Sequence, residues 1–272
     1  MKKIKLLVGT LKHVKAKQIF YQLYYRVRSK SKLNLRYEIV NSYDIDLLKG
    51  PSPSRSYIDY QTFSFLNIKT SFESVDWNCP IHGKLWTYNL NYFDFLNQEE
   101  LTKEEGLNLI QDFIAKGPTL KDALDPYPTS LRVINWVKFL SNHKIQDPII
   151  DLHLHNDLER LSKSLEFHLL GNHLLENGFG LLFGAYYFQD EFFYKKAKKI
   201  LVSELEEQIL KDGAHYELSP LYHQIILFRV LDSYNLVINN AWRSQELNVL
   251  LEQTAKKMLA WLKEISWRNG EI

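Results

Sequence analysis

The chain has 272 residues, enough for one large domain or two modest ones. Hydrophobic residues make up 45% of it and charged residues 24%, which excludes a disordered or collagen-like protein. Lys and Arg total 34 against 32 Asp and Glu, but residues 1–37 hold eleven of these cations and no acidic residue. A basic arm therefore precedes an acidic body. Such an arm suggests nucleic acid, anionic lipid or another polyanion, although a solvated amphipathic helix would have the same pattern.

Cysteine content and hydropathy bear on metals and compartment. Cys79 is the only cysteine, so no intrachain disulfide can form, and no CxxC or Cys/His cluster is present to bind zinc. We expect neither a metal nor a cofactor. The N-terminus shows no signal-peptide pattern, and the chain contains no run of 18 apolar residues. The default expectation is a cytoplasmic protein, with association with the cell envelope left open.

The N-terminal third divides into two segments. Apolar residues recur at helical spacing within residues 10–30, with basic residues between them, which predicts a basic amphipathic helix. Residues 33–79 show no sustained period and include the turn-rich Gly50-Pro51-Ser52-Pro53-Ser54, so we expect an irregular connector that wraps the body. We assign residues 1–80 to this helix and connector, and residues 81–272 to a helical domain.

Helical patterns dominate the rest of the chain and are separated by short loops. The predicted helices cover residues 99–115, 129–143, 149–169, 172–189, 191–210, 219–239 and 243–265. Thr129-Ser130 after a proline, and Ser219 before Pro220, are typical of helix starts. Short loops make consecutive helices antiparallel, so the helices form hairpins that stack as a bundle, a solenoid or a closed α/α toroid. The sequence shows no repeat of fixed period, which argues against a simple solenoid.

Three polar clusters interrupt the apolar pattern. The first, residues 86–95, combines aromatic rings with amides and includes Asn89 and Tyr92. Rings beside amides can stack on sugars, but a buried aromatic junction with satisfied amides fits equally well.

The second cluster lies between Gly171 and Gly180. On a helix Asn172, His173 and Glu176 would share one side, and a carboxylate beside an imidazole fixes its tautomer and raises its basicity. This pattern could transfer protons near neutral pH, or it could be a satisfied core histidine.

The third cluster covers residues 212–224 and contains Tyr222 and His223. Tyr222 falls in the first turn of a predicted helix, where the positive end of the dipole favours a phenolate or an anionic ligand. A tyrosine there can act as both base and acid, but an amphipathic core residue is the simpler interpretation of this segment alone.

Taken in order, four motifs resemble the N-terminal half of the heparinase II/III and alginate lyase-like family. They are residues 86–93, residues 126–136, residues 171–177, and residues 212–217 together with Tyr222. The resemblance runs from about residue 80 to the end, and the basic N-terminal helix is also similar to that of some members. It implies an all-α fold, an incomplete α/α toroid of antiparallel hairpins, whose cleft holds an acidic polysaccharide.

The resemblance also implies roles for individual residues in β-elimination at a uronic acid. Asn172 would neutralise the carboxylate, and His173 or Tyr222 would remove the C5 proton. Tyr222 would then protonate the departing O4. The predicted substrate contacts are Glu176, Arg132, Trp136, His223, Asn89 and Tyr92. Arg132 would make a charge-assisted contact with a carboxylate or sulfate.

Complete members of the family continue into a large C-terminal β-sandwich region that contributes a further catalytic histidine. The present chain stops at residue 272, so we expect a truncated product or a second half supplied as a separate chain. Two interpretations stay open: a polysaccharide lyase or its N-terminal half, and a non-catalytic helical module or remnant that binds polyanionic glycan or a partner. We expect no nucleic-acid partner, and weak contact of residues 1–37 with an anionic membrane is a further possibility.

Overall fold

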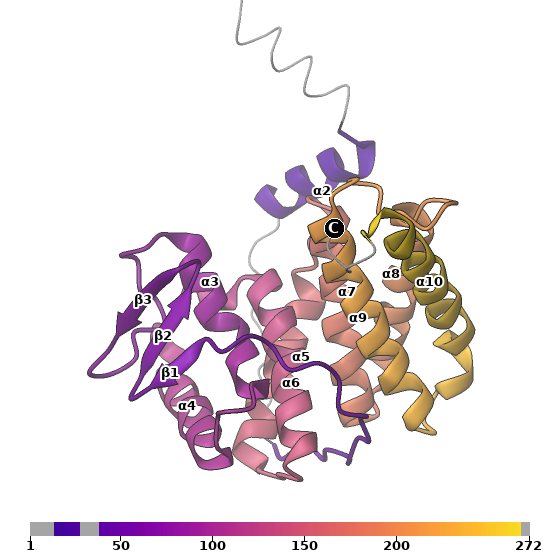
Figure 1. Ribbon diagram of the computed structural model, residues 1–272. Helices are drawn as coiled ribbons and strands as arrows, with labels where there is room; N and C mark the ends of the chain where they lie inside the picture. Colours follow the sequence, from indigo (N-terminus) through magenta and orange to yellow (C-terminus); the bar gives the residue numbers. More distant parts are fainter. Residues whose placement is uncertain (1–13, 28–37, 268–272) are drawn as a thin grey trace, which may run out of the picture.

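The computed structural model describes residues 14–27 and 38–267. Figure 1 shows a helical body with a small sheet on one flank and a separate helix, α2 (Ala16–Val27), across one end. Part of the predicted basic helix is therefore confirmed, and residues 10–13 and 28–30 of that prediction lie outside the described residues.

The connector that follows is held to the body by two asparagines, Asn235 in α9 (Pro220–Asn239) and Asn240 directly after this helix. The Asn235 side chain donates to the Leu48 carbonyl at 2.8 Å and accepts from its N–H at 3.0 Å. Asn240 bonds Asp46 in the same two-way manner, at 2.9 and 3.0 Å. Each amide thus satisfies both backbone groups of an extended segment. The prediction of an irregular, wrapping connector is confirmed for residues 38–56.

Residues 57–71 differ from that prediction, because they form an antiparallel sheet. Strands β1 (Tyr57–Asp59), β2 (Thr62–Phe65) and β3 (Ile68–Ser71) pair in the order β1-β2-β3. Both connecting turns use two residues with positive φ, Tyr60-Gln61 and Leu66-Asn67. Such turns are usually recognised by Asn-Gly or Asp-Gly pairs, and their absence hid the hairpins.

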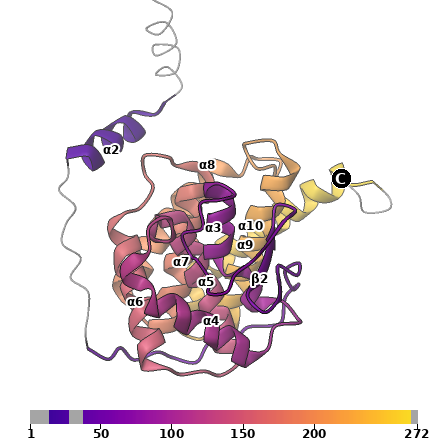
Figure 2. The same ribbon diagram turned by 90° about the vertical axis from the view of Figure 1, so that its left-hand side faces the viewer.

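The remaining helices, including three short 3-10 helices, follow in chain order. Their bounds are α3 (Lys84–Tyr92), η1 (Asp94–Asn97), α4 (Lys103–Ala115), η2 (Gly117–Thr119), η3 (Asp122–Leu124), α5 (Pro126–Asn142), α6 (Pro148–Lys163), α7 (Gly171–Phe188), α8 (Glu191–Gln208), α9 and α10 (Ser244–Ile265). Helices α5 with α6, α7 with α8, and α9 with α10 pack as hairpins, side by side in Figure 1. The predicted all-α architecture of antiparallel hairpins is confirmed. Figure 2 looks onto the flank of this arrangement, with α3 and the sheet in front of the hairpins.

Helix α7 is the centre of the body and is buried from Leu174 to Phe188. Two of its glycines allow close packing. A Cβ on Gly180 would lie 2.9 Å from the Ser130 Cα of α5, and one on Gly184 would lie 2.3 Å from a methyl group of Leu158 in α6. Substitution at either glycine would force neighbouring helices apart, so α7 fixes the spacing of the hairpins.

Two predicted helix starts can be compared with the observed ones. Ser219 caps α9, accepting the Tyr222 N–H at 3.5 Å, and Pro220 is the first helical residue, as predicted. The start at Thr129-Ser130 is wrong: α5 begins at Pro126, and both residues are buried inside it. Within the described ranges, none of the helices has the length and apolar character needed to cross a bilayer.

Candidate functional site

The N-terminal ends of α7 and α9 meet at one end of the body. A Cβ on Gly171, the first residue of α7, would lie 2.8 Å from the Tyr216 hydroxyl and 3.8 Å from a Glu217 carboxylate oxygen, both in the loop before α9. Helix α7 starts without a side-chain cap, so its first N–H groups are not satisfied by a capping residue. Asn172 and His173 in α7, and Tyr222 in α9, therefore occupy first turns of adjacent helices.

His173 is oriented by a glutamate that the sequence did not single out. Its Nδ1 lies 3.1 Å from the Glu166 carboxylate, in the loop before α7. The same carboxylate accepts from the Asn177 amide at 3.0 Å, and the Asn177 side chain accepts the Glu166 N–H at 2.8 Å. Helix α6 ends at Lys163 instead of the predicted residue 169, and Glu166 in the loop that follows fixes the imidazole tautomer. The prediction that Glu176 has this role is wrong.

Glu176 instead forms a buried ion pair with Arg229 of α9. The Arg229 Nε lies 3.1 and 3.3 Å from the two carboxylate oxygens, and the Glu176 side chain is fully buried. Burial by itself would lower the pKa of Arg229, but Glu176, Asp94 and Asp232 outweigh it and raise this pKa. The guanidinium is thus a permanent cation. Glu176 has no exposed surface for the predicted substrate contact and serves to position Arg229.

Aromatic rings connect α3 to the start of α7. The Tyr88 and Tyr92 rings lie 6.3 Å apart, Tyr92 and Tyr127 5.8 Å apart, and Tyr127 and His173 4.6 Å apart, measured between centroids. Burial raises the pKa of Tyr92, reinforced by Asp94, and burial with Glu176 raises that of Tyr127. Both phenols stay protonated near neutral pH and can donate hydrogen bonds, but they are poor bases.

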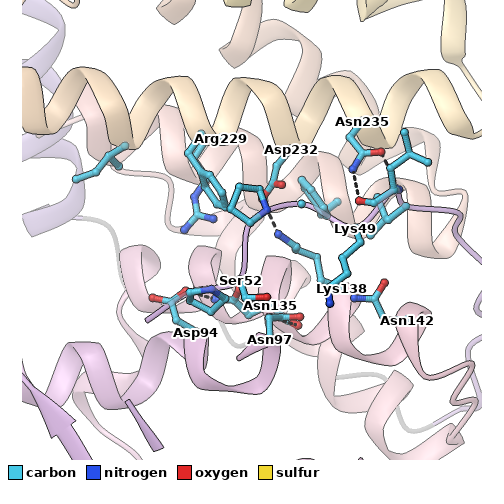
Figure 3. Close-up of a pocket in the computed structure, with 18 of the residues that line it drawn as sticks. Lys49, Ser52, Asp94, Asn97, Asn135, Lys138, Asn142, Arg229, Asp232 and Asn235 are labelled. Atoms are coloured by element: carbon cyan, nitrogen blue, oxygen red, sulfur yellow. Dashed lines mark hydrogen bonds and ion pairs between the residues drawn. The ribbon is translucent and has the colours of Figure 1, made fainter. Parts of the chain in front are cut away.

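A cavity of about 500 Å³ lies between α5, α9, η1 and the connector. In Figure 3, Arg229 and Asp232 extend from α9, opposite Asn135 and Lys138 of α5. Lys138 is 2.8 Å from Asp232, and the Asn135 amide donates to Asp94 at 2.6 Å and to the Tyr92 carbonyl at 2.8 Å. Cations and amides in one concave site are suited to bind a polyhydroxylated anion.

A second cavity, of about 820 Å³, is lined by residues of α2, α3, α6 and the loop before α7. Tyr88 and Glu166 are in its wall, and Lys84, Lys121, Arg160 and Lys163 supply most of its charge. The Tyr88 hydroxyl donates to Asp125 at 2.5 Å, and burial followed by this bond raises its pKa to about 12. Both cavities are therefore lined by cationic side chains.

Tyr222 is on the solvent-facing first turn of α9. Its hydroxyl has no hydrogen-bond partner in the described part of the chain, and its side chain is exposed. About two helical turns separate it from Arg229, so both residues lie on the same face of α9. The structure gives no direct contact between Tyr222 and His173, but places both at the end where α7 and α9 begin.

Arg132 differs most from its predicted role as a substrate contact, because it is fully buried. Its Nε and Nη2 donate to one oxygen of Asp157 at 2.9 and 2.7 Å, and its other donors reach the Ala123 carbonyl at 2.9 Å and the Thr129 hydroxyl at 3.3 Å. The guanidinium has no exposed surface with which to reach a ligand. Arg132 joins α5 to α6 and to the preceding loop.

Two other predicted contacts are also in the core. Trp136 is fully buried against Phe93 and Phe113. His223 is fully buried, with Nδ1 accepting the His215 N–H at 3.2 Å and Nε2 lying 3.0 Å from the Met258 carbonyl oxygen. These residues cannot contact a polymer without unfolding, so the predictions for Trp136 and His223 are corrected.

The sequence left two interpretations of the first polar cluster open, a surface that stacks on sugars and a buried aromatic junction. Trp86, Leu90 and Phe93 are buried, which makes one side of α3 an aromatic junction. Asn89 is partly exposed, and its amide donates to the Leu85 carbonyl at 2.8 Å. Tyr92 is nearly buried and belongs to the aromatic rings beside His173. A contact of Asn89 or Tyr92 with substrate stays a prediction.

Several residues of the site were missed in the sequence. Arg229 and Asp232 are the only charged residues of α9, which is otherwise apolar over many residues, and that isolation was a readable signal. Tyr127 lies between two prolines within the 126–136 motif, and the sequence predicts no separate role for it. Glu166 gave no signal, because its role depends on the loop before α7. Among the described residues, no cluster of three or more His, Cys, Asp or Glu side chains could hold a metal ion.

Comparisons with known proteins bear on this geometry. The family model described as heparinase II/III N-terminus matches residues 1–269. Comparison with the curated proteins gave no match.

Solved structures of lyases share the fold at low sequence identity. The structure of the heparan sulfate lyase HepC from Pedobacter heparinus is 17% identical, with a TM-score of 0.54, and the match covers 99% of this chain and 47% of that one. The structure of heparinase III, the BT4657 gene product, is 18% identical, with a TM-score of 0.57, over 99% of this chain and 47% of that one. The chain thus spans about half the length of these structures.

Proposed function

The chain belongs to the heparinase II/III N-terminal family, and from that premise we propose that it binds a uronate-containing acidic polysaccharide and contributes to its cleavage by β-elimination. The observation that carries the proposal is the meeting of the first turns of α7 and α9, which brings Asn172, His173 and Tyr222 to one end of the body. A fully ionised Arg229 lies in the cavity on the same face of α9 as Tyr222.

The proposed chemistry assigns one task to each group. Asn172 and the free N–H groups of α7 stabilise the uronate carboxylate, which lowers the cost of removing the C5 proton. His173, oriented by Glu166, or Tyr222 takes that proton. The C4–O4 bond then breaks, Tyr222 protonates O4, and the new chain end carries a C4–C5 double bond.

Charge and aromatic surface support a polyanionic sugar as ligand. Lys84, Lys121 and Arg160 line the larger cavity, and Lys138 and Arg229 line the smaller one. Tyr88 borders the larger cavity and heads the row of rings that ends at His173. Sugar rings stack on aromatic faces while cations bind their carboxylates or sulfates.

The test uses two tyrosines that differ mainly in position. Tyr222→Phe removes the proposed acid, and Tyr43→Phe on the connector is the matched control, because the two side chains are 39% and 43% exposed. We expect Tyr222→Phe to lower kcat at least about a hundredfold with binding unchanged, as is typical for loss of a general acid or base, and Tyr43→Phe to retain activity. Equal activity of both variants would refute the role of Tyr222.

A non-catalytic glycan-binding module is the second candidate function. It is favoured by one observation, that no direct contact joins Tyr222 to His173 among the described residues. Tight binding of acidic polysaccharide without turnover would select this function.

A further inference from the structure

Helix α2 attaches to the body through its more polar side. The Tyr25 hydroxyl donates to the Leu165 carbonyl at 2.6 Å, and the Gln18 amide donates to the Leu169 carbonyl at 2.9 Å. The Tyr21 ring stacks on Phe167 with centroids 4.6 Å apart. Gln18, Tyr21 and Tyr25 follow one another at helical spacing, so one side of α2 is fully used by this contact.

The opposite side of α2 carries an apolar stripe in solvent. Phe20, Leu23, Tyr24 and Val27 recur at intervals of three and four residues and are all exposed, with Phe20 at 61% and Val27 at 85%. A surface helix of a globular protein normally turns its apolar stripe toward the core. In α2 this arrangement is reversed, and none of the residues of the helix is buried.

Two basic residues of α2 flank the stripe, and others precede and follow α2 in the sequence. Lys17 and Arg26 are exposed on α2, and residues 1–37 as a whole contain eleven Lys and Arg and no acidic residue. A helix that combines an apolar, aromatic face with basic flanks is suited to the boundary between lipid headgroups and acyl chains. Each cation near an anionic bilayer adds to the attraction, and the attraction weakens with salt.

We propose that α2 is a docking helix for an anionic lipid bilayer, with Phe20, Leu23, Tyr24 and Val27 inserted at the interface. A hydrated polysaccharide would satisfy the basic residues but would not bury the aliphatic groups of Leu23 and Val27. A second copy of the chain would bring two strongly basic segments together, which charge repulsion opposes. In Figures 1 and 2, α2 lies on the outside of the body, which leaves its outer face accessible to a flat surface.

The test measures binding of the full chain to vesicles by flotation. Vesicles of equal parts phosphatidylglycerol and phosphatidylcholine are compared with vesicles of phosphatidylcholine alone. We expect binding to the anionic vesicles only, weakened at high salt. The triple variant Phe20→Ser, Leu23→Ser, Val27→Ser should lose more than tenfold in partition coefficient. The control variant Tyr60→Ser, Ile81→Ser changes exposed residues of the body and should bind normally.

A second readout locates the contact without depending on loss of binding. Phe20→Cys is labelled with a polarity-sensitive dye, and Tyr60→Cys serves as the labelled control, since the native Cys79 is buried and inaccessible to the reagent. A blue shift at position 20 alone, on addition of anionic vesicles, is the expected result. Absence of vesicle binding, equal binding of the triple variant, or concentration-dependent self-association that the triple variant abolishes would overturn the proposal.

Discussion

Replacing Arg132 by Met is predicted to destabilise the fold and to have no direct effect on ligand contacts. Arg132 makes two bonds to Asp157 and one each to Ala123 and Thr129, all inside the protein. Removing one partner of a buried ion pair costs about 3–5 kcal/mol, because the other charge stays buried. Arg160 remains 2.6 Å from the other oxygen of Asp157 and limits the penalty. We therefore expect the lower end, about 3 kcal/mol.

The assay is thermal unfolding, followed by the circular dichroism of the helices. A loss of about 3 kcal/mol lowers the Tm of a chain of this size by about 10 °C. The double variant Arg132→Met, Asp157→Leu is the control. It removes both charges, and the loss should be smaller than for Arg132→Met alone. An unchanged Tm together with weakened polysaccharide binding would refute the structural role of Arg132 and restore the predicted substrate contact.

Three further predictions concern stability. Glu176→Gln should lower the free energy of unfolding by about 2 kcal/mol, because buried Arg229 loses its ionised partner. The measurement is the midpoint of urea unfolding, and an unchanged midpoint would show that the ion pair of Glu176 and Arg229 does not stabilise the fold. Burial and the neighbouring His223 lower the pKa of His215 to about 4. The contribution of His215 to the free energy of unfolding is therefore fully present above the unfolded pKa of about 6.5 and is lost toward pH 4, by about 3 kcal/mol. A Tm that stays constant between pH 7 and 4 would contradict this. Gly213→Ala should cost about 2 kcal/mol by the same urea assay, because φ is 94° and a Cβ would meet a backbone carbonyl of α10 at 2.2 Å; a neutral effect would contradict this close approach.

The helices were predictable because their signals are local. Apolar spacing and capping residues lie within one segment, so the sequence analysis predicted α9 within a residue at its start, with Ser219 and Pro220 in the expected roles. The start of α5 was misplaced because the hydroxyls of Thr129 and Ser130 do not cap the helix: they donate to the carbonyls of Ala123 and Pro126, at 3.4 and 2.8 Å. The sheet was missed because its turns lack glycine.

The predictions for individual site residues depended on tertiary contacts that no local pattern reveals. Arg132 and Arg229 are both isolated cations in helices, but one bonds a buried aspartate and the other lines a cavity. Spacing placed His173 beside Glu176, whereas the loop before α7 brings Glu166 to the imidazole. The side of a helix that becomes buried is decided by packing of all hairpins together, and only the structure shows it.

The most direct test of the proposed β-elimination is the mass balance of the products in water labelled with heavy oxygen. Uronate polysaccharides such as heparan sulfate are incubated with the chain, alone and with any separately encoded C-terminal β-sandwich chain. β-Elimination predicts fragments whose masses sum to that of the substrate, with a C4–C5 double bond and no heavy oxygen, and their loss in Tyr222→Phe. Fragments that have gained one labelled water would show hydrolysis, and no fragments from any uronate polymer would leave only glycan binding; either result would contradict the proposed lyase function.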